Sequence, residues 1–163
     1  MNQQEMSNKV SSHSEADETE SIFHLRIVRE AFSKWSAGTG SILDLMPADG
    51  VVVIPGTVPH CGTFSKRQFV AEVATPFLAR FSKPPAPRLR KIWADGSDVA
   101  VLADAEGTMQ DGRPYANSYV FILELRDGHL MKATEFLDMA AFNVVWDSID
   151  PASYAEKTTE EDQ

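Results

Sequence analysis

Three long runs of β-branched, aromatic and aliphatic residues dominate the second half of the chain. They cover residues 99–109, 115–125 and 129–139, and each run is longer than most strands. The connections between them carry Asp111-Gly112 and Asp127-Gly128, and Asp-Gly tolerates the positive φ of tight hairpin turns. The pattern therefore predicts a three-stranded antiparallel meander.

Alternate positions along these strands define two unequal faces. The more uniformly apolar face includes Val101, Ala103, Val120, Ile122 and Phe136. The other face mixes carboxyl, amide, phenol and apolar groups: Asp104, Glu106, Thr108, Tyr115, Asn117, Tyr119, Phe121, Ala133, Glu135 and Leu137. A sheet of this kind can pack a helix on its plain face and line a cavity with its mixed face.

The first half of the chain has helical periodicity. Apolar residues at three- and four-residue spacing over 21–38 predict an amphipathic helix that Gly38 ends. Residues 66–81 predict a further helix, with a kink or break near Ala74 because Pro76 lies inside it. The remaining expected segments are a short helix over 41–46, a strand over 51–54, a loop over 56–64, an extended spacer over 82–87, a strand over 88–94 and a closing helix over 140–149.

Most of the predicted helices precede the antiparallel strands along the chain, and this order predicts an α+β fold. In this fold a curved sheet wraps the N-terminal helices and leaves an open-ended cone, a shape that can hold a ligand. We expect one domain over 21–149, a disordered acidic tail over 1–20 and a second acidic tail over 150–163.

Composition narrows the class of protein. The 163 residues are 43% hydrophobic and carry a net charge of −9, but residues 1–20 and 150–163 each contribute −4. Acidic ends without a basic stripe disfavour nucleic acid and membrane surfaces as partners. The single cysteine cannot form an intrachain disulfide, and we see neither a membrane-spanning run nor a signal-peptide pattern. We therefore expect a soluble cytoplasmic protein.

Three motifs resemble a known family. Gly-Arg-Pro-Tyr-Ala-Asn-Ser-Tyr-Val-Phe (112–121), Arg-Asp-Gly-His-Leu (126–130) and Glu-Phe-Leu-Asp (135–138) look like the SnoaL-like branch of the nuclear transport factor 2-like superfamily. The resemblance implies the cone fold, also called cystatin-like, and a homodimer formed through the outer face of the sheet. It leaves the reaction open, because the superfamily includes isomerases, cyclases, epoxide hydrolases, dehydratases, lyases and proteins that only bind.

The known mechanisms of this superfamily fit the chain unequally. Ketosteroid isomerases use one aspartate as the general base and a second, protonated aspartate as a hydrogen-bond donor. This sequence has Ile54 at the first of these positions and Phe121 at the second, so that mechanism is not expected. In limonene-epoxide hydrolase-like members, Glu106 and Glu135 fall at or near the two acid positions, but Asp104 stands in place of the bridging arginine. SnoaL-type polyketide cyclases require a single acidic residue, which this chain has.

Strand parity and the likeness to the isomerase pocket place five polar residues inside the cone: Asp104, Glu106, Asn117, Tyr119 and Glu135. Carboxylates crowded in a partly apolar cavity cannot all ionise, so one could act as general acid and another as base. The amide and the phenol could donate hydrogen bonds to a developing oxyanion. Alternatively, Asp104 and Glu106 pair with Arg88 or Arg90 on the neighbouring strand, or lie solvated at the rim.

Further candidates surround this group. His60 lies in a loop expected near the cavity mouth and is a possible general base. The ligand-binding wall is expected to include Trp35, Ile54, Tyr115, Phe121 and Leu137, with Asn117 and Tyr119. Neither a metal-ligand spacing nor a glycine-rich phosphate loop is present, so we expect no metal and no cofactor.

These residues predict a cavity for a small hydrophobic molecule, cyclic or aromatic. The matching chemistry is cofactor-independent acid/base catalysis by an isomerase, a lyase or dehydratase, or a hydrolase. The alternative is a non-catalytic ligand-binding or dimeric assembly module, whose cavity is filled by Tyr119, Phe121 and Leu137.

Overall fold

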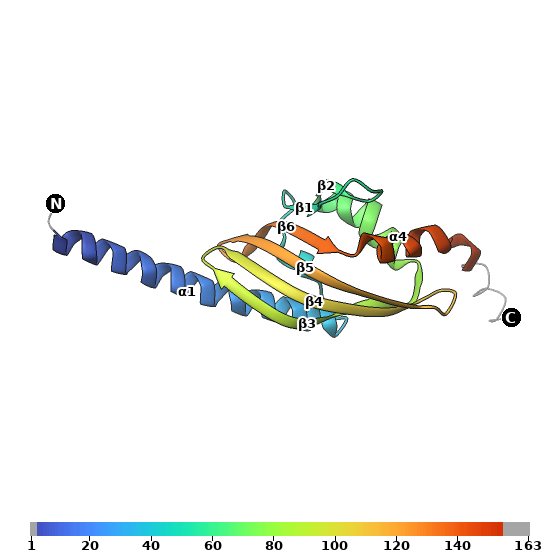
Figure 1. The fold of residues 1–163 in the computed structure, drawn as a ribbon, viewed down its shortest axis with the longest axis horizontal. Coiled ribbons are helices and arrows are strands. Elements are labelled where there is room, and N and C mark those ends of the chain that lie inside the picture. The colour runs from blue at the N-terminus through green and yellow to red at the C-terminus, as the bar shows by residue number, and fades with distance from the viewer. Residues whose placement is uncertain (1–2, 155–163) are drawn as a thin grey trace.

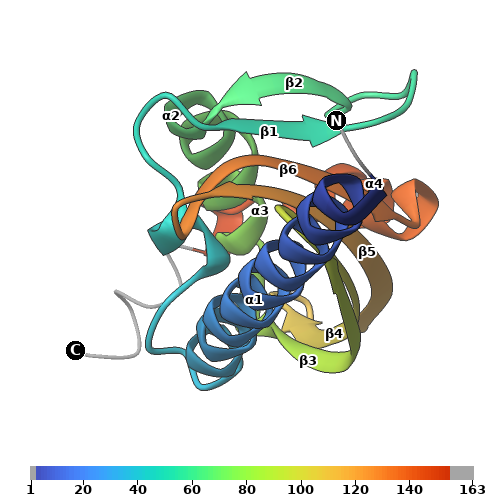
Figure 2. The same cartoon turned by 90° about the vertical axis from the view of Figure 1, so that its left-hand side faces the viewer.

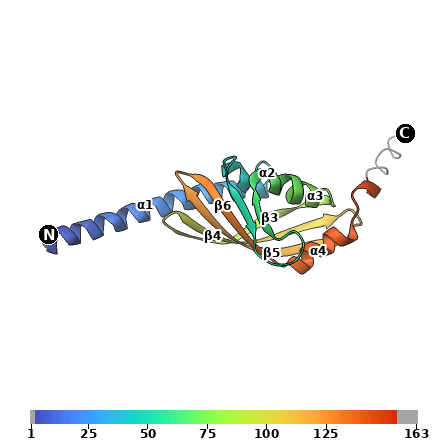
Figure 3. The ribbon, with the colours of Figure 1, turned by 90° about the horizontal axis from the view of Figure 1, so that it is seen from above.

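The computed structural model describes the backbone of residues 3–154 and the side chains of residues 15–154. Helix α1 (Gln3–Ser36) begins well before the predicted start at Ser21, and it includes residues that were expected to be disordered. Neither glycine nor proline occurs in this segment, so the chain has no strong helix breaker there. The first part of α1 projects beyond the strands (Figures 1 and 3). Of the predicted C-terminal tail, residues 155–163 lie outside the described part.

The predicted cone is confirmed as a curved, unclosed sheet beside α1 (Figure 2). Its order is β2-β1-β6-β5-β4-β3, and every neighbouring pair is antiparallel except β1 with β6. The strands are β1 (Val51–Ile54), β2 (Gly62–Ser65), β3 (Phe81–Asp95), β4 (Asp98–Met109), β5 (Pro114–Arg126) and β6 (His129–Leu137). The predicted meander is therefore confirmed as β4, β5 and β6.

The two predicted hairpin turns have the expected backbone conformation. Gly112 has a φ of 85°, and Asp127 and Gly128 have φ values of 50° and 78°. The two successive positive φ angles of the second turn are typical of the tight hairpin that Asp-Gly favours, and in the first turn the positive φ lies at the glycine.

Two segments expected to be loop or spacer belong to the sheet. Strand β2 overlaps the end of the predicted loop 56–64 and pairs with β1, and β3 includes the proline-rich segment 82–87. Proline is tolerated in β3 because this strand lies at the edge of the sheet, where one row of N–H groups needs no partner.

The break predicted in the helix after Ser65 is present. The segment consists of α2 (Lys66–Gln68), a π-helical turn η2 (Phe69–Ala74) and α3 (Thr75–Leu78). Thr75 donates its N–H to the carbonyl of Val70, five residues back, and Pro76 follows. A proline cannot donate the next backbone bond, so the widened turn lies where the regular pattern fails.

Two shorter helices complete the fold. They are the 3-10 turn η1 (Ile42–Leu45) and α4 (Met139–Ser148), which Asp138 caps by accepting the N–H groups of Ala140 and Ala141. Among the described helices, none is both long and apolar enough to cross a membrane.

The core lies between α1 and the inner face of the sheet. Val28 and Phe32 of α1 pack towards Val101, Phe121 and other buried strand residues. His24 of α1 is also buried, and its Nδ1 lies 3.1 Å from the carbonyl oxygen of Gly96 in the β3–β4 turn.

The predicted face of β4 is wrong. Ala103 pairs with Tyr119 and Ala105 pairs with Asn117, so these alanines share the inner face with the polar side chains of β5. Asp104 and Glu106 therefore point to the outer face. The prediction had grouped Asp104 and Glu106 with Asn117 and Tyr119, an error of one residue in the register between β4 and β5. Such an error assigns every side chain of a strand to the opposite face.

Candidate functional site

A cavity of about 300 Å³ lies inside the cone, between the sheet and the helices. The sheet contributes β1, β3, β4, β5 and β6, and the helical side contributes the end of α1, η1, η2, α3 and α4. The lining residues are Trp35, Gly40, Ser41, Ile42, Leu43, Ile54, Phe69, Val73, Ala74, Phe77, Leu78, Pro85, Pro87, Ala105, Tyr119, Phe121, Glu135, Leu137 and Phe142. Apolar and aromatic side chains predominate, which suits a hydrophobic ligand.

Glu135 is the ionisable carboxyl group in the wall of this cavity. It lies on β6 opposite Phe121 and is 9% exposed. Within the described part of the chain, its carboxylate has neither a hydrogen bond nor an ion pair. Burial raises the pKa of Glu135 from 4.5 to about 7, because the charged form loses its hydration without gaining a partner.

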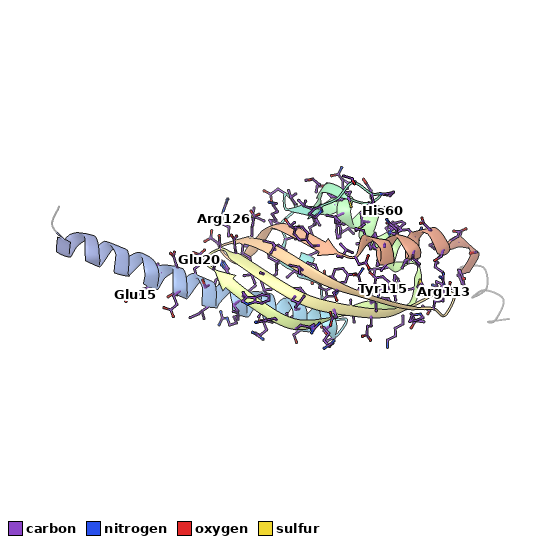
Figure 4. The ribbon with its side chains drawn as sticks, viewed as in Figure 1. Glu15, Glu20, His60, Arg113, Tyr115 and Arg126 are labelled. Carbon is purple, nitrogen blue, oxygen red and sulfur yellow. The ribbon has the colours of Figure 1, made fainter. Side chains whose placement is uncertain are left out.

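Tyr119 is the second polar group of the cavity wall, and a chain of hydrogen bonds supports it. Its hydroxyl lies 2.8 Å from the hydroxyl of Tyr115, which accepts a hydrogen bond of 3.0 Å from Nδ2 of Asn117. The same Nδ2 donates to the carbonyl of Asp138, and the N–H of Asp138 donates to Oδ1 of Asn117. Burial raises the pKa of both tyrosines. Tyr115 and Asn117 thus stand behind Tyr119 and are not part of the wall (Figure 4 labels Tyr115).

The other two predicted carboxylates are separated from Glu135 by the sheet. Asp104 accepts a hydrogen bond of 2.8 Å from Arg88 and one of 2.9 Å from Ser118, and it lies 3.4 Å from Arg90. This arrangement confirms the alternative in which Asp104 pairs with arginines of the neighbouring strand. Glu106 is exposed on the same outer face. The prediction that both residues point into the cone is therefore wrong.

His60 lies in the β1–β2 loop over α4 rather than in the cavity wall (Figure 4). Its ring stacks on Trp146 with centroids 3.9 Å apart, and the Arg80 guanidinium lies 4.1 Å from the centroid of the same indole. Burial and the charge of Arg80 lower the pKa of His60. Phe142 lies between this stack and the cavity, because it contacts the His60 ring and also lines the wall.

Six of the predicted site residues line the cavity: Trp35, Ile54, Tyr119, Phe121, Glu135 and Leu137. Sequence reasoning missed much of the opposite wall. The apolar spacing of Phe69, Val73 and Phe77 predicted a buried helix face, but nothing in it indicated a cavity. Pro85 and Pro87 were missed because the spacer was not assigned to the sheet. Within residues 15–154, no three histidine, cysteine or carboxylate side chains lie close enough to hold a metal ion.

Comparison with known proteins adds information about the fold. Neither a protein-family model nor a curated protein sequence matches this chain. Solved structures do match.

A candidate SnoaL-like polyketide cyclase from Jannaschia sp. CCS1 superposes with a TM-score of 0.63 at 17% identity, covering 80% of this chain and 96% of its own. An NTF2-like protein from Burkholderia thailandensis E264 gives 0.60 at 14% identity, covering 76% and 96%. TerC, crystallised with polyporic acid, gives 0.59 at 21% identity, covering 77% and 98%. This chain therefore has the fold of the SnoaL-like and NTF2-like proteins, as its motifs predicted.

Proposed function

We propose that this protein binds a small hydrophobic cyclic molecule in the cone and uses Glu135 as an acid/base group. The observation that carries the proposal is a carboxyl group without a partner among the described residues, set in a predominantly apolar cavity. A pKa of about 7 allows this group to hold or release a proton near neutral pH.

The cavity limits the kinds of acid/base reaction that the proposal can include. Glu106 lies on the other face of the sheet, so the hydrolase mechanism with two carboxylates has no support from the geometry. A single carboxyl is enough for an isomerisation, an elimination or a cyclisation, in which the same group can remove and return a proton. Two of the structural neighbours, the candidate cyclase and the protein crystallised with polyporic acid, support a small organic ligand.

The proposal is tested by titrating the carboxyl carbon of Glu135 in carbon-13-labelled protein. We expect a midpoint of about pH 7, which moves when a ligand from a panel of bicyclic aromatic compounds enters the cavity. Glu135→Gln identifies the resonance, and Glu106→Gln is the matched control because it changes an exposed carboxyl on the outer face. A normal midpoint that no compound disturbs would contradict the acid/base assignment. Ligand binding without any turnover would favour the non-catalytic alternative.

We also propose that the protein forms a homodimer through the outer face of the sheet. Trp93, Val120 and Phe136 are 46%, 38% and 49% exposed there, on β3, β5 and β6. Exposed apolar side chains on several strands of one face are typical of an interaction surface.

Phe136→Lys should convert the dimer into a monomer in sedimentation experiments, because it places a charge within this apolar surface. Val144→Lys, on α4, is a control of matched exposure, since Val144 is also 49% exposed. Loss of the dimer in both variants, or in neither, would contradict this interface.

A further inference from the structure

The hydrogen bonds behind Tyr119 have a direction that can be assigned from the contacts. The backbone N–H of Asp138 can only donate, so the atom of Asn117 that it contacts at 3.0 Å must be the acceptor Oδ1. Nδ2 is then the donor to the carbonyl of Asp138 and to the hydroxyl of Tyr115. The start of α4 thus fixes the orientation of the amide.

The orientation of the amide in turn fixes the proton of Tyr115. This hydroxyl already accepts a hydrogen bond from Asn117, and the side chain is 4% exposed. Among the described residues, the Tyr119 hydroxyl, 2.8 Å away, is the remaining partner for its O–H. A buried donor left without an acceptor loses its hydrogen bond to water and gains nothing in return, which is unfavourable. Tyr115 therefore donates to Tyr119.

The O–H of Tyr119 is therefore available to donate a hydrogen bond into the cavity. Its oxygen accepts from Tyr115, and its O–H has no acceptor among the described residues, Glu135 included. Tyr119 and Glu135 occupy adjacent strands, since Tyr119 pairs with Leu137 and Glu135 with Phe121, and both line the same cavity. Donors aligned in one direction also strengthen one another, which makes the last hydroxyl a better donor.

We infer that Asn117 and Tyr115 are positioning residues that turn the Tyr119 hydroxyl towards the ligand, and that the ligand is a hydrophobic ring compound with a carbonyl oxygen next to Glu135. The inference rests on the proposed function and specifies its ligand class. A carbonyl oxygen can only accept, so it complements a hydroxyl whose proton has no other acceptor among the described residues. A ring without an acceptor leaves this hydroxyl unpaired in an apolar cavity, which costs affinity.

The test compares α-tetralone with tetralin, two bicyclic compounds of nearly equal size that differ in the carbonyl. We expect wild type to prefer α-tetralone, and Tyr119→Phe to weaken α-tetralone by about fivefold to tenfold, the loss of one hydrogen bond. The same variant should leave the affinity for tetralin unchanged or slightly increased. Ser118→Ala is the control, since Ser118 lies on β5 but contacts Asp104 on the outer face.

Asn117→Asp tests the direction of the chain without touching Tyr119. Once ionised, an aspartate cannot donate to Tyr115, so at a pH above the pKa of the new carboxyl Tyr115 should turn its O–H towards the carboxylate and Tyr119 should donate to Tyr115 instead of to the ligand. The preference for α-tetralone should fall as far as in Tyr119→Phe. The carbonyl carbon-13 resonance of bound, labelled α-tetralone should move towards its position in an apolar solvent, a change that a purely structural role would not produce.

Tyr115→Phe keeps the inference testable if the aspartate variant does not fold. It removes the donor to Tyr119, and the carbonyl resonance should lie between those of wild type and Tyr119→Phe. Equal preference in wild type and Tyr119→Phe, or a carbonyl resonance unchanged by both upstream variants, overturns the inference but leaves the proposed function intact. Failure of both compounds to bind to wild type overturns the proposed function and the inference with it.

Discussion

Glu135→Gln is expected to increase the free energy of unfolding at about pH 8 by roughly 3 kcal/mol and to change it little at about pH 4. The reason is the raised pKa of Glu135, about 7 in the fold against 4.5 in the unfolded chain. Below the lower value both states are protonated and burial of the carboxyl costs little. Between the two values the unfolded chain ionises first, so the free energy of unfolding falls as pH rises. Above the higher value the full penalty is present.

Urea unfolding between about pH 4 and pH 8 measures this effect. The difference between wild type and Glu135→Gln should grow with pH and level off above the folded-state pKa. Glu106→Gln, exposed on the outer face, is the matched control and should follow wild type throughout. A constant difference between wild type and Glu135→Gln across this range would mean that Glu135 is not buried as a lone carboxyl, and the acid/base proposal would lose its physical basis.

A residue that lowers stability at neutral pH in this way is itself informative about function. Glutamine or leucine at this position would avoid the penalty of a buried charge. Strained or destabilising groups tend to gather at functional sites, where activity compensates for the lost stability. The carboxyl that lowers stability above its raised pKa is therefore the same group that the proposed function uses to hold and release a proton.

Local patterns were sufficient to predict most of the fold. The Asp-Gly pairs specified the hairpins because this dipeptide tolerates positive φ angles, at Gly112 in the first turn and at both Asp127 and Gly128 in the second. Pro76 marked the break between η2 and α3 because it lacks a backbone donor. These features depend on neighbouring residues alone, so the sequence contains the information needed to predict them.

The candidate site was harder to predict because it depends on register. Glu135 and Tyr119 were correctly predicted to lie on the inner face. The alternation of residues along β4, however, does not tell which of its two sets of side chains shares that inner face. The register across the β4–β5 turn decides this, and it turns Asp104 towards Arg88 and Arg90. The cavity wall formed by Pro85 and Pro87 could not be predicted either, since it requires the spacer to join the edge of the sheet.

Phe121→Ala is expected to lower the free energy of unfolding by about 3–5 kcal/mol, the usual cost of truncating a fully buried phenylalanine. The ring is 1% exposed, and its centroid lies 5.5 Å from that of Phe32, 6.0 Å from Trp35 and 5.7 Å from Tyr119. The Phe121 ring packs against α1 in the core and also lines the cavity, so its removal eliminates packing contacts in both places.

Phe136→Ala is the matched control for this change, because it truncates the same residue type on the adjacent strand. Phe136 is 49% exposed on the outer face, so the monomer should lose less than about 1 kcal/mol. Urea unfolding at several protein concentrations separates the two effects: the loss in Phe121→Ala should not depend on concentration, whereas any larger loss in Phe136→Ala should appear where the wild type is dimeric. Equal, concentration-independent losses in both variants would contradict the assignment of inner and outer faces on which the cavity, the position of Glu135 and the dimer surface all depend.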